Sequence, residues 1–100
     1  MRPALAAIVL CAAGAAAGVP MREQARKVLE ARRCGTCHDS TVSTEHPKAL
    51  AVYDLHDPDW SAKMSNDRLP KLMTRLRAAP EPDQKLIQRF IAQELVERSN

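Results

Sequence analysis

The feature that most limits the fold of this chain is the pentapeptide Cys34-Gly35-Thr36-Cys37-His38, which places two cysteines and a histidine together. Such a motif serves three kinds of site: a redox-active disulfide, a zinc site, and a covalently attached haem. Each kind needs a different scaffold around it. The rest of the chain therefore decides between them.

Residues 1–18 have the layout of a secretory signal peptide. Arg2 supplies a positive charge, residues 4–13 form an apolar run, and small residues follow as at a cleavage site. The run is shorter than the roughly 20 residues that span a bilayer, although an uncleaved anchor is the alternative. We interpret Cys11 as removed with the signal, because bulky residues precede it where lipoprotein processing needs small ones. The sequence thus predicts export to the periplasm and one domain over residues 19–100.

An exported domain of this size needs more than its apolar core to stay folded, because such a core contributes only about 3–5 kcal/mol. Cys34 and Cys37 are the two cysteines that remain after cleavage. A disulfide between them would close a loop too small to constrain the unfolded chain much. A large buried cofactor would supply the missing apolar surface.

The pattern of apolar residues predicts an all-α domain. Spacings of three and four indicate helices over residues 21–33, 65–78 and 82–98. Residues 39–60 have the composition of a loop, except for a short apolar run over residues 49–55 whose period is ambiguous. The sequence has no strand pattern of period two and no internal repeat.

A haem explains the motif better than the two alternatives. A thioredoxin-like site would follow a buried strand, and none is predicted before Cys34. Zinc would need two more ligands, and the spacing of His46 and His56 does not match that of zinc fingers. With a haem, two thiols bond the two vinyl groups and the next histidine supplies an axial nitrogen. This attachment takes place outside the cytoplasmic membrane, where the signal peptide would send the chain.

With this motif and these helices, the chain resembles the cytochrome c family over residues 21–98. The resemblance implies a small helical domain wrapped around one covalently bound haem c. Cys34 and Cys37 correspond to the thioether cysteines and His38 to the proximal iron ligand. The first and last helices of the family pack against each other. The corresponding contact would involve Val28, Leu29, Phe90 and Ile91.

The sixth iron ligand departs from the family pattern. The family usually places a methionine in a loop shortly before the last helix, but residues 74–80 contain none. Met64 is our first candidate, because it falls off the apolar stripe of the next predicted helix and packing does not account for it. Met73 lies on that stripe. His46, His56 and an open position are the remaining alternatives.

The single tryptophan, Trp60, has two interpretations. A lone tryptophan in a small domain most often belongs to the core. Beside a haem it could instead pack on the porphyrin edge, or donate its indole N–H to a propionate.

The expected function is one-electron transfer through a single haem, between redox protein partners in the periplasm. The alternatives are a haem-based binder or sensor of small gases, and a haem-bearing subunit of a larger redox complex. We do not expect an enzyme, because the sequence has no Ser/His/Asp arrangement and no Gly-rich phosphate loop. Nor do we expect nucleic acid binding, because fourteen basic residues after Arg2 are interleaved with twelve acidic ones. Membrane association is expected only if the signal peptide is uncleaved.

Overall fold

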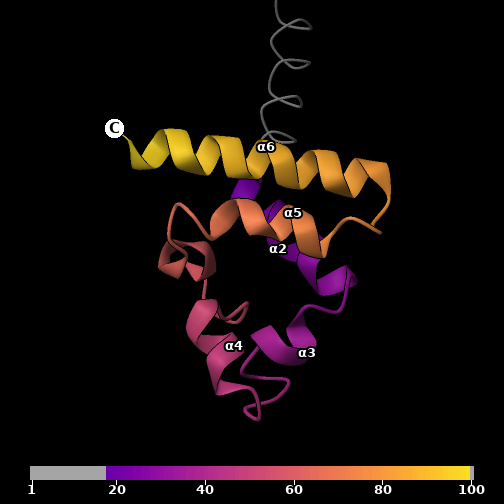
Figure 1. Ribbon diagram of the computed structural model, residues 1–100, viewed down its shortest axis with the longest axis vertical. Coiled ribbons are helices and arrows are strands. Elements are labelled where there is room, and N and C mark those ends of the chain that lie inside the picture. The colour runs from indigo at the N-terminus through magenta and orange to yellow at the C-terminus, as the bar shows by residue number, and fades with distance from the viewer. Residues whose placement is uncertain (1–17, 100) are drawn as a thin grey trace, which may run out of the picture.

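Figure 1 shows a computed structural model of the protein, which describes residues 18–99. The described residues form a small, compact, all-helical domain without strands, which confirms the predicted fold class at that level. The predicted signal peptide lies outside this range, apart from Gly18. The elements are α2 (Met21–Ala31), α3 (Gly35–His38), α4 (Pro47–Val52), the 3₁₀ turns η1 (Trp60–Lys63) and η2 (Leu69–Lys71), α5 (Leu72–Arg75) and α6 (Glu81–Arg98). Within residues 18–99 no helix has the length and apolar character needed to cross a membrane.

The two long helices, α2 and α6, contact each other, as the family resemblance implied (Figure 1). Helix α2 turns Ala25 and Leu29 into the core. Helix α6 begins after Pro80 and carries Glu81 and Asp83 in its first turn, where acidic side chains favour the positive end of the helix dipole. Its buried face carries Ile87, Phe90, Ile91 and Glu94.

The region over residues 65–78, which the sequence predicts as one helix, is instead the turn η2 followed by the short helix α5. Pro70 explains the difference, because it has no N–H to donate and its ring obstructs a regular α-helix. Ser65 still accepts a hydrogen bond from the backbone N–H of Arg68 at 3.2 Å, but it does so in a turn. The apolar positions face inward as predicted. The buried ones are Leu69, Leu72 and Leu76.

The run over residues 49–55, whose period is ambiguous in the sequence, contains a helical part and an extended part. Helix α4 continues to Val52, and Tyr53 then adopts extended backbone with φ −162° and ψ 155°. This change of conformation buries Tyr53 and Leu55, which are 5% and 1% exposed. The run thus links a surface helix to the core.

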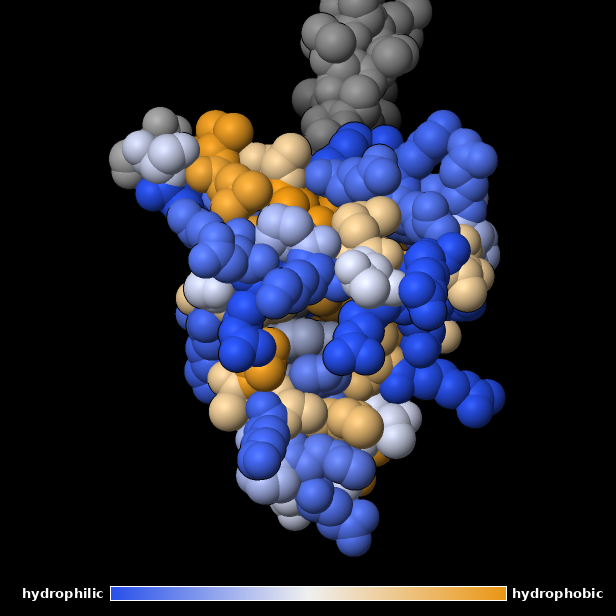
Figure 2. Space-filling view, viewed as in Figure 1, coloured by the Kyte–Doolittle hydropathy of each residue, from blue (hydrophilic) through white to orange (hydrophobic). Residues whose placement is uncertain are grey.

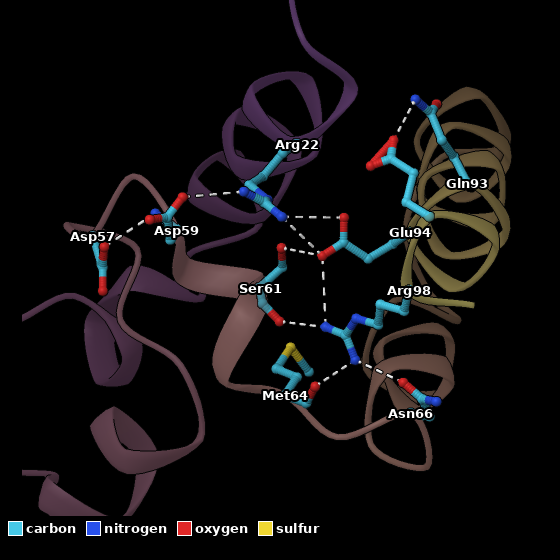
Figure 3. Close-up of polar contacts among 10 residues, drawn as sticks. Arg22, Asp57, Asp59, Ser61, Met64, Asn66, Gln93, Glu94 and Arg98 are labelled. Atoms are coloured by element: carbon cyan, nitrogen blue, oxygen red, sulfur yellow. Dashed lines mark hydrogen bonds and ion pairs between the residues drawn. The ribbon is translucent and has the colours of Figure 1, made fainter. Parts of the chain in front are cut away.

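Glu94 lies at the centre of a buried polar network that joins α2, α6 and η1 (Figure 3). Its carboxylate accepts hydrogen bonds from the hydroxyl of Ser61 at 2.7 Å and from Arg22 at 3.1 Å, and Arg98 lies 3.5 Å away. Arg98 also donates to the main-chain oxygens of Ser61 at 2.7 Å and Met64 at 2.6 Å. Because the network reaches the backbone, it holds the segment 61–64 against both long helices.

The same contacts set the charge state of Glu94. Burial alone would raise the pKa of its carboxyl group, but the hydrogen bonds from Ser61 and Arg22 outweigh burial and hold that pKa below its ordinary value. A lowered pKa in the folded state means that the carboxylate stabilises the fold above the pKa of glutamate in the unfolded chain. This stabilisation is lost as the pH falls through the lower pKa of the folded state.

We predict that Glu94→Gln lowers the free energy of unfolding at neutral pH by about 2–3 kcal/mol, because Arg22 and Arg98 lose their buried counter-charge. Urea denaturation measures this loss, which should shrink as the pH falls well below about 4.3 and the parent carboxylate takes up a proton. Glu97→Gln, at an exposed carboxylate bonded to Gln93, is the matched control and should cost at most about 0.5 kcal/mol. Equal losses of unfolding free energy in the two variants would contradict the central role of Glu94 in the network.

Candidate functional site

The Cys-x-x-Cys-His motif begins where α2 ends. Arg33 takes a left-handed backbone conformation, with φ 66°, that stops the helix. Across this turn the N–H of Cys34 donates to the oxygen of Leu29, and the N–H of Arg33 donates to that of Glu30, both at 3.0 Å. Many helix ends are capped by this pair of hydrogen bonds, and the residue in the left-handed conformation is usually glycine. The turn fixes the backbone of Cys34 next to the core.

Both cysteines of the motif are half-buried and carry free thiols. They lie in one helical turn, in which the backbone N–H groups of Cys37 and His38 both donate to the oxygen of Cys34. Burial raises the pKa of the Cys34 thiol, and a hydrogen bond with Tyr53 and the charge of Arg32 oppose that rise without cancelling it. A redox-active Cys-x-x-Cys site has the opposite property, a lowered cysteine pKa.

The imidazole of His38 is oriented by two main-chain carbonyl groups. Its Nδ1 lies 2.9 Å from the oxygen of Ala49 and 3.3 Å from that of Tyr53. Carbonyl oxygens only accept hydrogen bonds, so Nδ1 carries the proton and donates. In the neutral ring the lone pair is then on Nε2. Metal-binding histidines are commonly oriented in this way, by a carbonyl or carboxylate at the other ring nitrogen.

The ring of Tyr53 stacks on the imidazole of His38, with the ring centroids 3.9 Å apart and the planes 6° from parallel. A ring stacked on the face of an imidazole does not block the Nε2 lone pair, which points outward in the plane of that imidazole. The row continues from Tyr53 to Trp60 at 5.5 Å and from Trp60 to Phe90 of α6 at 5.4 Å. Aromatic packing thus connects His38 to the core between the long helices.

The segment between His38 and Leu55 is a loop whose two ends are joined by hydrogen bonds. The N–H of Leu55 donates to the oxygen of His38 at 2.6 Å, and the N–H of Ser40 donates to a carboxylate oxygen of Asp54 at 3.0 Å. Compact surface loops whose ends lie close together are frequently functional. Here the loop contains α4, which presents the Ala49 oxygen to His38.

Trp60 is fully buried, and its indole Nε1 has no hydrogen-bond partner among the described residues. A buried donor without an acceptor costs about 1–3 kcal/mol, so it points to an acceptor beyond the described residues. A haem propionate is an acceptor of that kind. Two thiols on one helical turn and a histidine oriented through Nδ1 are the donors that a haem attachment site needs. On these observations the residues fit a covalently attached haem.

Met64 is 4% exposed and belongs to the hydrophobic core, so our expectation that packing does not account for it is wrong. The turn η1, which the sequence analysis did not anticipate, directs its side chain inward. Its role as an iron ligand stays a prediction. Met73 is half-buried and packs against the same core.

His46 and His56 are exposed. Within residues 18–99 no three His, Cys, Asp or Glu side chains gather as they would around a metal ion. Neither histidine therefore joins Cys34 and Cys37 as a zinc ligand in the described part of the chain.

Two surface hollows, of about 210 and 380 Å³, are lined by Arg22 and Glu94 together with neighbouring residues of α2 and α6. Cys34, Cys37 and His38 line neither of them. The chemistry of the motif therefore depends on its own loop and on the aromatic row, rather than on these hollows.

Sequence reasoning missed Tyr53 and the carbonyl group of Ala49. A signal for Tyr53 was present, because an aromatic residue at the end of an apolar run is a common core residue. No signal marks the carbonyl group of Ala49, since every residue carries one and only the closed loop brings this one to His38.

Comparisons of the chain with known protein families, with curated proteins and with solved structures find no match. The function is therefore inferred from the residues and their geometry. The geometry consists of two half-buried thiols, an oriented imidazole and a buried indole N–H without an acceptor in the described part of the chain.

We predict that Tyr53→Ala lowers the free energy of unfolding by about 3–5 kcal/mol, because it removes the ring that packs between His38 and Trp60. Tyr53→Phe, which keeps the ring, should cost about 1 kcal/mol. Urea denaturation compares the two variants, and nitrogen NMR of His38 should show the proton on Nδ1 in the Phe variant as in the parent. If the two variants were equally destabilised, the hydroxyl group rather than the stack would support His38.

Proposed function

We propose that this protein is a c-type cytochrome with a single haem, which transfers single electrons between redox proteins outside the cytoplasmic membrane. The proposal rests on the position of His38 and on the hydrogen bond that orients its imidazole. His38 directly follows the two thiols, and the bond from Nδ1 to the Ala49 oxygen leaves Nε2 as the ring nitrogen available to a metal.

Cys34 and Cys37 would hold the haem through thioether bonds, and His38 would ligate the iron. A bound haem supplies a one-electron Fe(III)/Fe(II) couple. Trp60 would donate its indole N–H to a propionate, which would satisfy a buried donor that has no partner among residues 18–99. We assign the sixth position to Met64, with Met73 as the alternative.

The protein chain itself orients the imidazole of His38 and shields it from water. The Ala49 oxygen keeps the proton on Nδ1 of His38 and makes Nε2 a better donor to a metal. Tyr53 covers one face of the imidazole and Trp60 extends the apolar wall, so both limit the access of water. Burial and hydrogen bonding of this kind are the means by which proteins set the potential of a haem.

A haem-based binder of small gases is the second candidate, and one observation favours it. The side chain of Met64 packs in the core, and the segment 61–64 is held by Arg98 and Glu94. If these contacts keep the sulfur of Met64 away from the iron, the sixth position is open to a gas.

We predict that the mature protein, made in a host that attaches c-type haem, carries one haem per chain through Cys34 and Cys37. The mass of the polypeptide should include the haem after acid–organic extraction, because thioether bonds survive that treatment. Replacing both cysteines with alanine should remove it. Cys11→Ala is the control and should retain the haem, because that residue leaves with the signal peptide. A parent mass that corresponds to free or disulfide-bonded thiols alone would refute the proposal.

We predict that the oxidised protein shows the weak far-red band of methionine-ligated ferric haem, and that Met64→Leu loses it. The reduction potential should also fall, because a thioether ligand raises it. Met73→Leu is the matched control and should keep the band. Both swaps nearly conserve core volume, so each should cost at most about 1.5 kcal/mol of stability. If only the Met73 variant loses the band, Met73 rather than Met64 is the sixth ligand. If the parent lacks the band and binds carbon monoxide, the gas binder is favoured.

A further inference from the structure

The main-chain groups of Met64 are held by hydrogen bonds on both sides of the residue. Its N–H donates to the oxygen of Ser61 at 3.1 Å, which closes the turn η1. Its own carbonyl oxygen accepts a bond from the guanidinium group of Arg98 at 2.6 Å. With both groups bonded, the backbone of Met64 is fixed, and its sulfur moves by rotation about the side-chain bonds.

Arg98, the last residue of α6, holds this turn at two oxygens. Besides its bond to Met64, it donates to the main-chain oxygen of Ser61 at 2.7 Å, the same oxygen that accepts the N–H of Met64. A guanidinium group suits this task, because its donors form a rigid planar fork. One side chain of α6 thus spans the segment 61–64 (Figure 3).

Glu94 holds the guanidinium group of Arg98 in this orientation. Its buried carboxylate lies 3.5 Å from Arg98, one helical turn away on α6, and accepts the hydroxyl of Ser61 at 2.7 Å. Arg22 of α2 donates to both oxygens of the same carboxylate, at 3.3 and 3.1 Å. The network therefore fixes Arg98, and Arg98 fixes the backbone of Met64.

On its outer side, the turn η1 is not packed tightly against α6. A surface hollow of about 380 Å³ lies there, lined by Ala62 of the turn and by Glu94, Glu97 and Arg98 of the helix, among others. On the face shown in Figure 2, the surface below the C-terminal end of α6, at the left of the view, is mostly hydrophilic. The hydrogen bonds of Arg98 thus bridge a space that side chains do not fill.

We propose that Arg98 is a positioning residue for the sixth iron ligand, an inference that rests on the proposed function. Its bonds to two main-chain oxygens keep the sulfur of Met64 on the iron and so keep small gases off it. Without them the turn is free to move into the adjacent hollow and to withdraw the sulfur. Positioning also gives the buried ions a role, since apolar side chains of similar volume often stabilise a fold as well as a buried ion pair does.

The test compares variants of the haem-bearing protein. Arg98→Gln removes both main-chain bonds together with the charge, whereas Arg98→Lys keeps the charge and loses the fork. Gln84→Ala is the matched control, because Gln84 is also a polar residue of α6 that donates to main-chain oxygens. Those oxygens belong to Leu76, Arg77 and Ala79, away from the segment 61–64.

Reduced Arg98→Gln should bind carbon monoxide about tenfold faster than the parent, because the state in which the sulfur has left the iron becomes about tenfold more populated. The far-red band of the oxidised protein should weaken. The amide hydrogen of Met64 should exchange with deuterium about tenfold faster, as measured by NMR. Arg98→Lys should give intermediate values of all three, which separates the hydrogen bonds from the charge. Gln84→Ala should match the parent.

Carbon monoxide rates in both Arg98 variants equal to that of the parent would overturn the inference. A stronger far-red band in these variants would also overturn it, because the network would then hold the sulfur away from the iron. If Gln84→Ala speeds the binding as much as Arg98→Gln does, lost stability alone explains the effect and the inference falls. If Arg98→Gln does not fold, as judged by circular dichroism, the comparison of Arg98→Lys with the parent decides.

The absorbance of the purified parent is measured first. A parent that carries haem but lacks the far-red band would overturn the inference and leave the proposed haem site intact. A chain without haem would refute the proposed function itself, and the two failures are thereby distinguished.

Discussion

The hydrogen bond from Nδ1 of His38 to the main-chain oxygen of Ala49 is the contact on which the proposed site depends. It exists only because the loop after the motif closes on itself, through the bond between the backbone groups of His38 and Leu55. Opening the loop would free the imidazole and allow the proton to move to either nitrogen. The loop is therefore part of the site, because it holds the imidazole of His38 in place.

The aromatic row joins this loop to the rest of the domain. Tyr53 packs on His38, Trp60 packs on Tyr53, and Phe90 brings in α6, so three distant parts of the chain meet along one line of rings. The Glu94 network fixes the backbone directly after Trp60 (Figure 3). Together these contacts hold the indole N–H in a buried place where residues 18–99 offer it no acceptor. A bound group that supplies the acceptor would offset the free-energy cost of burying this N–H.

The sequence predicted the all-helical class and the helices now seen as α2 and α6, because amphipathic spacing and helix ends are local signals. The contact between these two helices was implied only by the resemblance to the cytochrome c family. It failed over residues 65–78, where the apolar spacing is helical but Pro70 interrupts the backbone pattern. It also failed for the packing of Met64, whose burial depends on a turn that brings it to distant α6. The carbonyl group of Ala49 and the buried carboxylate of Glu94 could not be predicted, since their roles come from partners distant in the sequence.

An optical spectrum of the purified protein shows whether His38 and its two neighbouring thiols hold a haem. We expect the sharp visible bands of a low-spin c-type haem in the reduced state, which shift on oxidation and remain with the polypeptide after acid–organic extraction. A protein without visible absorbance, isolated from a host that attaches haem to c-type cytochromes, would show that the motif holds no haem. So would a haem spectrum that is lost from the polypeptide on extraction.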